Sequence, residues 1–586
     1  MKSFLKFTFA SLIALSIFAF IFIFVILAII GSASNKEAFI VKENSILKLE
    51  LSNTIVDRAS ENPLENFNIQ AMKPDNKIGL NVLLKQLNLA KTDDKIKGIY
   101  LDLTSIPAGV ATMEELRDAI LDFKTSGKFV FAYADYYTQK TYYLASAADK
   151  VYVNPEGLVE LKGLNAEVMF YTEALQKIGV EPIIIRHGKF KSAVEPFMLN
   201  SMSDANKEQT SKFIGTIWNN ILDGISKSRN ISVDELNRYA NEMLITDAKS
   251  SLEYKLVDGL KYKDELLTEL GDSVGVKDFD DINFVSLSNY KDAIKFNPDR
   301  EPTDNRIAVI YATGEIKMGE GSNSEIGSDG ISEQIRIARK DSTIKAIVLR
   351  VNSPGGSALA SDIIWREMVL AKAVKPVVVS MGDVAASGGY YISCPADKIF
   401  ANRNTITGSI GVFGLMWNGT ELMNNIGIHT DGVKTNDHAD IGSTNRPMSE
   451  DEKAVIQKSV EDIYGTFISH VGEGRKMETA DVDSIGQGRV WSGVNAIEIG
   501  LIDEFGGLKT AVEEAAKLAK LENYKIKELP EHKDFMQEIL KELTGEAKAN
   551  ILQESLGASY RYYNGLNKIL NTKGVQARVP YEIEIY

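Results

Sequence analysis

The sequence predicts an α/β protein made of two tandem units of one fold, which follow an N-terminal transmembrane helix. The first observation is a repeat: residues 93–103 read DDKIKGIYLDL, and 248 positions later residues 341–351 read DSTIKAIVLRV. The second is that short apolar strands alternate with helical patterns, which favours a parallel sheet covered by helices. The third is a long uncharged segment near the N-terminus, residues 7–30.

Residues 7–30 have the length and composition of a membrane-spanning helix. They are 24 apolar or small residues without a charge, enough to cross a hydrocarbon core of about 30 Å. Lys2 and Lys6 precede them, which favours a cytoplasmic N-terminus. A cleaved signal peptide is the alternative, because residues 32–34 are small, but its apolar region is usually about 7–15 residues long. We expect a single-pass anchor in the plasma (inner) membrane, in contact with the lipid bilayer, and a periplasmic body.

The repeat also sets the domain organisation. It continues in residues 142–154 (YYLASAADKVYVN) and 390–402 (YYISCPADKIFAN), without a gap over about 85 residues. We expect four segments: 1–34 as cytoplasmic N-terminus and anchor, 35–300 as first unit, 301–521 as second unit, and 522–586 as a C-terminal helical extension. Residues 268–304 are expected to connect the units.

Local patterns predict the elements of these segments. The stretch 346–351 is apolar apart from Arg350, as a strand buried on both faces requires, and YEIEIY at the C-terminus alternates like an edge strand. In chain order we expect strands at 46–51, 307–316, 346–351 and 377–380, a helix at 361–373, a helix start at 386–393, a strand at 399–401, a helix over 534–570 and an edge strand at 581–586.

Composition excludes several classes of function. The net charge of -14 argues against nucleic acid as a partner. The single cysteine, Cys394, excludes an internal disulfide framework. The five histidines are scattered and form no cluster with metal-ligand spacing, so we expect neither a metal nor a cofactor.

A glycine-rich turn follows one predicted strand. Residues 351–358 read VNSPGGSA, and the backbone N–H groups of Gly355 and Gly356 can face a ligand closely. Such groups suit an oxyanion hole, which needs hydrogen-bond donors already placed where negative charge develops on the substrate in the transition state. The alternative is an ordinary strand-to-helix turn.

A serine with small neighbours follows the next strand. Residues 382–393 read GDVAASGGYYIS, and the alanines and glycines around Ser387 allow a peptide backbone to approach its hydroxyl. The N–H of Gly388 can then join Gly355 or Gly356 in holding an oxyanion. The alternative is that Ser387 only caps a helix.

A lysine in the first unit is the candidate base. Residues 187–197 read HGKFKSAVEPF, where Lys189 and Lys191 would share one face of an extended segment. Burial lowers the pKa of a lysine, and a neutral lysine can take the proton of a serine hydroxyl. The alternative is a solvated basic loop.

The repeat joins these motifs into one site. Ser387 falls opposite Gln139, and Lys191 falls opposite Ala439, so each unit carries only half of a Ser/Lys pair. One active site then needs both units. A histidine base, His187 or His438, is the alternative, although neither lies in a nucleophile-elbow arrangement.

Together the motifs resemble the signal peptide peptidase A (SppA) family in its long, tandem-repeat form, a group of bacterial membrane-anchored serine proteases. The resemblance rests on KSAVEPF at 191–197, VNSPGG at 351–356, AASGGYYIS at 385–393 and TGSIGVFG at 407–414. It implies two ClpP/crotonase-like spiral ββα domains. It also implies site roles: Ser387 as nucleophile, Lys191 as general base, and Gly355 or Gly356 with Gly388 as oxyanion donors.

The resemblance further implies the substrates and the assembly. The substrates would be remnant signal peptides and other unfolded or membrane-associated peptides, and the assembly a homotetramer with its active sites on a concave face. Two alternatives stay open: a non-catalytic scaffold, and an acyl-CoA hydratase-like enzyme of the same fold. The Ser/Lys complementarity argues against the hydratase, which has no use for it.

Overall fold

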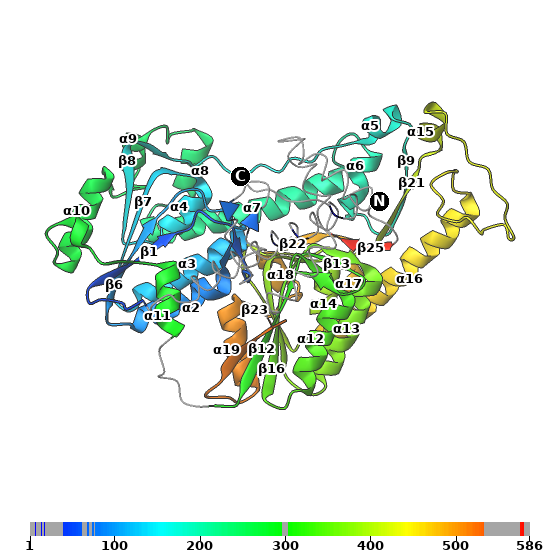
Figure 1. Ribbon diagram of the computed structural model, residues 1–586. Coiled ribbons are helices and arrows are strands. Elements are labelled where there is room, and N and C mark those ends of the chain that lie inside the picture. The colour runs from blue at the N-terminus through cyan, green and yellow to red at the C-terminus, as the bar shows by residue number, and fades with distance from the viewer. Residues whose placement is uncertain are drawn as a thin grey trace.

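The computed structural model describes residues 39–60, 67–68, 73–74, 77–295, 303–531 and 575–578, together with Lys6, Ile13 and Ile17. These residues form two α/β units, with the sheet of the first unit on the left of Figure 1 and that of the second below its centre. Within the described ranges, no helix combines the length and the apolar character needed to cross a membrane.

The first unit is built on a six-stranded parallel sheet with the order β10-β8-β7-β6-β1-β11. Its strands are near-continuous apolar runs because both faces are covered: in β6, five of seven residues are buried. The strands are β1 (Ser45–Glu50), β6 (Ile96–Asp102), β7 (Phe129–Tyr137), β8 (Lys150–Val159), β10 (Gly259–Leu260) and β11 (Phe284–Ser286). Two short pairs accompany them: β2 (Ile55–Val56) with β5 (Ile78–Gly79), and β3 (Phe67–Asn68) with β4 (Lys73–Pro74).

The first unit also contains helices, most of which lie around this sheet. They are α2 (Leu80–Thr92), α3 (Val110–Lys124), α4 (Gln139–Ala145), α5 (Thr172–Lys177), α6 (Glu195–Met198), α7 (Asp204–Arg229), α8 (Val233–Asn241), α9 (Ala248–Glu253), α10 (Lys263–Val274) and α11 (Leu287–Lys295), with 3₁₀ turns at Ser192–Val194 and Phe279–Asp281. Helices α5 and α6 lie apart from the sheet, beside residues 181–186 at the upper right of Figure 1.

The second unit has an eight-stranded sheet with the order β22-β20-β18-β16-β12-β24, from which β19 and β23 branch beside β18. Its strands are β12 (Arg306–Thr313), β16 (Ile344–Ser353), β18 (Val377–Ala386), β19 (Lys398–Ala401), β20 (Ile406–Gly408), β22 (Val490–Ser492), β23 (Glu504–Phe505) and β24 (Lys525–Leu529). Its helices are α12 (Ser328–Lys340), α13 (Ala358–Lys372), α14 (Gly388–Ser393), α15 (Thr420–Asn425), α16 (Glu450–Arg475), α17 (Thr479–Ile485), α18 (Gly493–Glu498) and α19 (Leu508–Leu518).

The repeat extends from sequence to structure. Helices α2 and α12, α3 and α13, and α5 and α15 begin and end at positions that differ by the same 248 residues. The two units are therefore copies of one fold.

A third sheet joins the units. It contains seven strands in the order β14-β15-β13-β17-β25-β21-β9. Strand β9 (Glu181–Arg186) comes from the first unit and pairs antiparallel with β21 (Phe413–Asn418) of the second, and the two form the ribbon at the upper right of Figure 1. The other strands are β13 (Glu315–Lys317), β14 (Gly321–Ser322), β15 (Glu325–Gly327), β17 (Gly355–Ser357) and β25 (Val575–Arg578).

A buried polar network also holds the units together. Arg350 of β16 is fully buried, donates through Nε to Asp57 at 2.7 Å, and forms an ion pair with Glu115 of α3 at 2.6 Å. Asp383 of β18 accepts from the backbone N–H of Thr112 at 2.9 Å. The buried Arg350 guanidinium is thus paired with carboxylates, as burial of a charge in a low-dielectric interior requires.

The structure corrects two element predictions and leaves others untested. Residues 522–586 are not a purely helical extension, because β24 within them pairs with β12 in the second sheet and β25 joins the third sheet. Residues 268–304 are not a plain connector, because β11 within them pairs with β1 and adds an edge strand to the first sheet. The strand predicted at 377–380 is longer, since β18 continues to Ala386. The helix predicted at 534–570 and the edge strand at 581–586 lie outside the described residues, as does the anchor at 7–30 apart from Ile13 and Ile17.

Candidate active site

The pairing of β9 with β21 carries the lysine motif into the second unit. Arg186 lies opposite Phe413 at the end of the ladder. The backbone N–H of His187 then donates to Val412 at 3.1 Å, and that of Phe190 donates to Gln487 at 2.9 Å. The segment that ends in Lys191 is therefore held on the second unit by backbone hydrogen bonds.

Lys191 and Ser387 meet in the interior of the protein. The Lys191 Nζ lies 2.9 Å from the Ser387 Oγ, and neither residue is exposed to solvent. The same Nζ lies 3.1 Å from the Oγ and 3.2 Å from the carbonyl oxygen of Ser409. A neutral amine at this distance can accept the hydroxyl proton of Ser387.

Ser387 occupies a strained turn between β18 and α14. Its backbone has φ of 54° and ψ of -114°, a region that residues with a side chain rarely adopt. The turn is fixed on both sides, because the Ser387 N–H donates to Gly408 at 2.8 Å and its carbonyl accepts from Tyr391 at 2.8 Å. The strain is concentrated at the residue whose hydroxyl faces Lys191.

Burial sets the protonation of Lys191. Desolvation lowers the pKa of its amine well below the ordinary value of 10.5, because the interior penalises the ammonium form. Glu195, which could oppose this shift, turns away: its carboxylate accepts from the Ser203 N–H at 3.1 Å and from the Asn206 amide at 3.0 Å, at the start of α7. Among the apolar neighbours of Lys191 in the sequence, Ala193, Val194 and Phe197 are buried and Phe190 is half-buried.

The glycines of the two predicted oxyanion motifs lie against each other. A Cβ added to Gly355, whose φ is +96°, would lie 2.7 Å from the backbone nitrogen of Gly388, so only glycine fits there. The Gly355 N–H donates to the Ser353 Oγ at 3.1 Å. Gly356 lies opposite Ile316 in the ladder between β17 and β13.

The other sequence candidates lie in different surroundings. Lys189 is exposed, and the backbone around it forms a turn, so the prediction that Lys189 and Lys191 share one face of an extended segment is wrong. The His187 ring stacks on Tyr464 with centroids 4.0 Å apart. His438 is exposed beside Asp451. In the described part of the chain, no histidine forms a hydrogen bond with Ser387.

The residues that correspond to Ser387 and Lys191 in the repeat have different surroundings. Gln139, opposite Ser387, donates through its amide to the Gly163 carbonyl at 2.8 Å. Ala439, opposite Lys191, lies in an exposed loop. Ser387 and Lys191 thus meet across the two units, whereas their repeat counterparts Gln139 and Ala439 form no such pair with each other.

Sequence reasoning missed two residues of the site. Ser409, which contacts the Lys191 amine, lies within TGSIGVFG, but nothing in that motif identifies a lysine partner. Gly488 packs against the Lys191 backbone: a Cβ there would lie 2.6 Å from the Lys191 Cβ. No local pattern around Gly488 indicates that contact.

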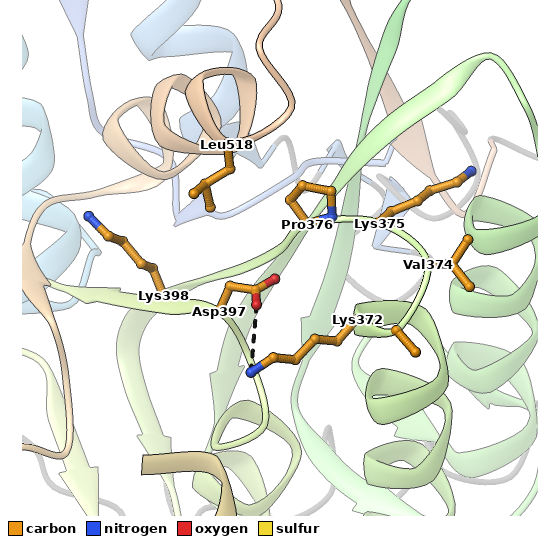
Figure 2. Close-up of a pocket in the computed structure, with 8 residues that line it drawn as sticks. Lys372, Val374, Lys375, Pro376, Asp397, Lys398 and Leu518 are labelled. Carbon is orange, nitrogen blue, oxygen red and sulfur yellow. Dashed lines mark ion pairs between the residues drawn. The ribbon is translucent and has the colours of Figure 1, made fainter. Parts of the chain in front are cut away.

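A surface hollow shown in Figure 2 is separate from this site. It borders the starts of β18 and β19, whereas Ser387 follows the end of β18. Lys372 and Asp397 form an ion pair of 3.6 Å in it. Its remaining labelled residues are Val374, Lys375, Pro376, Lys398 and Leu518. Among the residues described, no cluster of histidine, cysteine and carboxylate side chains could hold a metal ion.

Comparison with known proteins identifies the family and the fold. The model of peptidase family S49 matches residues 122–277 and again 370–522, one region in each unit. The Clp protease model matches residues 299–407. The chain therefore has an α/β ClpP-like fold with two S49 regions.

Whole-length relatives are proteases. Protease 4 of Salmonella typhi is 38% identical over 90% of this chain and 86% of its own length. Protease 4 of Haemophilus influenzae is 36% identical over 85% and 83%. The chloroplastic serine protease SPPA of Arabidopsis thaliana is 32% identical over 92% and 78%.

Proposed function

The chain belongs to peptidase family S49, among the serine proteases of the Protease 4 and SppA type, and on that premise we propose that it cleaves peptides with a Ser387/Lys191 dyad. The observation that carries this proposal is the 2.9 Å approach of the Lys191 Nζ to the Ser387 Oγ in a fully buried setting. A solvated lysine would stay protonated at neutral pH, whereas desolvation favours the neutral base that the reaction needs.

In the proposed mechanism, neutral Lys191 takes the Ser387 hydroxyl proton as the Oγ attacks the scissile carbonyl. The oxyanion is held by the Gly388 N–H, with a second donor from Gly355 or Gly356. Lys191 then gives its proton to the leaving amine. Water, activated by the same amine, hydrolyses the acyl-enzyme and restores Ser387.

The test is labelling of the detergent-solubilised full-length protein with a serine-reactive fluorophosphonate, together with hydrolysis of a fluorogenic peptide. We expect labelling of Ser387 in the wild type and none in Ser387→Ala, with turnover reduced by on the order of 10⁶. Lys191→Ala should be about as damaging, and the double variant little worse, because groups that act as one unit are not additive.

The matched control is Lys189→Ala, since Lys189 is two residues away and exposed. It should retain most of the activity. Near-normal turnover in Ser387→Ala would refute the dyad and make Ser353 or Ser409 the candidates. An unlabelled, inactive wild type would instead favour a non-catalytic scaffold.

We also propose that the protein is anchored in the membrane and that remnant signal peptides are among its substrates. The support is the uncharged run at 7–30 behind Lys2 and Lys6, together with the similarity to SppA-type proteases. Protease added to spheroplasts should digest the body of the protein. Complete protection, or a mature N-terminus near Asn35, would contradict the anchor.

A homo-oligomer, specifically a tetramer, is proposed from the same similarity. Sedimentation of the detergent-solubilised protein should give a mass about four times the 64.7 kDa of the chain. A monomer at the concentration at which the protein is active would exclude it.

A further inference from the structure

A buried glutamine of α7 lies beside the segment that carries Lys191. Helix α7 belongs to the first unit and contacts β22 of the second (Figure 1). Its residue Gln209 is only 1% exposed, although glutamine side chains mostly lie at the surface. A buried amide needs hydrogen-bond partners, so the partners of Gln209 indicate why a glutamine lies there.

The amide of Gln209 joins the two neighbours of the base to the second unit. Its Nε2 donates to the carbonyl oxygen of Phe190 at 3.1 Å and to the Oγ of Ser192 at 2.7 Å, the residues before and after Lys191. Its Oε1 accepts from the backbone N–H of Val490, the first residue of β22, at 3.2 Å. One side chain therefore ties the backbone on both sides of Lys191 to β22.

The residues just before Val490 contact the base themselves. Gly488 packs against the backbone of Lys191. The carbonyl of Arg489 accepts from the N–H of Ser409 at 2.7 Å, and the Ser409 hydroxyl lies 3.1 Å from the Lys191 amine. The hydrogen bond to Val490 thus attaches Gln209 to the short stretch of the second unit that borders the base.

An amide suits these partners because it carries both a donor and an acceptor. The Val490 N–H can only donate and the Phe190 carbonyl can only accept, which fixes the orientation of the side chain between them. Asn206, one turn earlier in α7, supports this orientation: its Oδ1 accepts from the Gln209 Nε2 at 3.3 Å, while its Nδ2 donates to Glu195 at 3.0 Å. A carboxylate of the same shape could accept from Val490 but, when ionised, could not donate to Phe190.

We infer that Gln209 is a positioning residue for the proposed dyad: it fixes the backbone on either side of Lys191 and so keeps the Lys191 Nζ within reach of the Ser387 Oγ. This inference rests on the proposed function. Gln209 acts through Phe190, Ser192 and β22 rather than on the reacting atoms. Its loss should therefore slow the proton transfer, since a shift near 1 Å costs about 10²-fold in rate.

The experiment measures kcat and KM for a fluorogenic peptide with the detergent-solubilised full-length protein, over the pH range in which histidine and lysine side chains titrate. Gln209→Met, similar in length but without the amide, should lower kcat by about 10²-fold with little change in KM. The pKa that controls kcat/KM should move up toward the ordinary 10.5, because a displaced amine regains water. Labelling of Ser387 by fluorophosphonate should slow in proportion to kcat.

Gln86→Met is the matched control. Gln86 is a buried glutamine of α2, 2% exposed, which donates to the Leu287 carbonyl. Its replacement should lower the thermal stability, as Gln209→Met does, but leave kcat and the pH profile unchanged. Gln209→Glu serves if Gln209→Met does not fold. It keeps the shape and the acceptor for Val490, loses the donor when ionised and adds a negative charge, so kcat should fall and the controlling pKa should rise.

The possible results separate this inference from the proposed function. If the wild type is active and a folded Gln209→Met or Gln209→Glu keeps its kcat and pH profile, the positioning role is refuted and the proposed function stands. A higher KM at unchanged kcat would also refute it, because Gln209 would then act on peptide binding. A fully active Lys191→Ala, or a wild type that neither hydrolyses peptides nor reacts with fluorophosphonate, would refute the proposed function itself.

Discussion

At the scale of single residues, the position of Lys191 is unfavourable for stability and favourable for chemistry. Its amine is fully buried, and its polar contacts are with Ser387 and Ser409 rather than with a carboxylate. An acidic partner would stabilise the ammonium form and remove the base. Two serine hydroxyls instead orient the amine without adding charge, and desolvation lowers its pKa.

The first prediction concerns the pH dependence of activity. Only neutral Lys191 can accept the Ser387 proton, so kcat/KM should rise with pH and level off above a pKa well below the ordinary 10.5. The measurement is kcat/KM from pH 5 to about 10, the range in which histidine and lysine side chains titrate. A controlling pKa near 6.5 that disappears in His187→Asn or His438→Asn would replace the lysine base with a histidine.

The second prediction concerns stability at the same residue. Because the folded-state pKa of Lys191 is lowered, the unfolded chain holds one more proton between that pKa and the ordinary 10.5, so the free energy of unfolding rises with pH across this window. Lys191→Met removes the buried amine. It should be inactive yet more stable, by about 0.5–2 kcal/mol, the usual size of a single stabilising substitution, most clearly below the lowered pKa.

Urea denaturation at several pH values measures this effect. Exposed Lys189→Met is the control and should show no pH-dependent difference from the wild type. A Lys191→Met variant that is less stable than the wild type at every pH would contradict this prediction. It would mean that the hydrogen bonds of the amine with the Ser387 and Ser409 hydroxyls stabilise the folded protein by more than burial of the amine destabilises it.

At the scale of elements, the pairing of β9 with β21 brings the two residues of the proposed site together. It brings residues 196 positions apart into hydrogen-bond distance. Gly488 is part of this arrangement: its φ is +82°, and the backbone nitrogen of Lys191 lies 2.7 Å from where its Cβ would be. The close approach leaves no space for a side chain between the segment that carries Lys191 and the second unit.

We therefore expect Gly488→Ala to displace Lys191 and reduce kcat by about 10²-fold, the usual effect of a shift near 1 Å. The protein should remain folded, as judged by circular dichroism. Gly432→Ala is the matched control, because a Cβ at Gly432 meets nothing within 4 Å. Equal activity of the two variants would show that Lys191 is not held by this contact.

At the scale of the whole molecule, the two units fold around shared contacts. The hydrophobic core of the first unit includes Ala386, Ile406 and Val490 of the second. Glu115 of the first unit accepts from the Asn402 amide at 2.9 Å and from the Leu508 N–H at 3.0 Å, besides its ion pair with Arg350. The proposed active site depends on this contact because each unit supplies one residue of the proposed Ser387/Lys191 pair.

Glu115→Ala should accordingly destabilise the entire chain. It leaves the buried Arg350 with one carboxylate partner, and breaking a buried ion pair costs about 3–5 kcal/mol. Urea denaturation should show one transition, shifted to lower urea. The control is Glu242→Ala, which removes an exposed pair with Arg238 and should cost about 0.3–0.5 kcal/mol. Two separate transitions, with only one shifted, would mean that the units unfold independently.

The sequence by itself determined the repeat, the alternating α/β pattern and the identity of the residues in each motif. The offset of 248 residues recurs without change in helices α2 and α12, and both helices bury three corresponding apolar positions: Leu83, Leu87 and Ala90 in α2, and Ile331, Ile335 and Ala338 in α12. The opposition of Ser387 to Gln139, and of Lys191 to Ala439, already required a contact between units. Because these features are local or repeated, they can be recognised in the amino-acid sequence without the structure.

Only the tertiary structure decided which groups meet. The contact of Ser409 with the Lys191 amine, the packing of Gly488 against that lysine and the seating of Val575–Arg578 beside Gly356 join segments far apart in the chain. The structure also shows that Lys191 lies in the interior, whereas Lys189, two positions earlier, is exposed to solvent. Such contacts depend on strand pairing and side-chain packing between units, and no spacing within a motif encodes them.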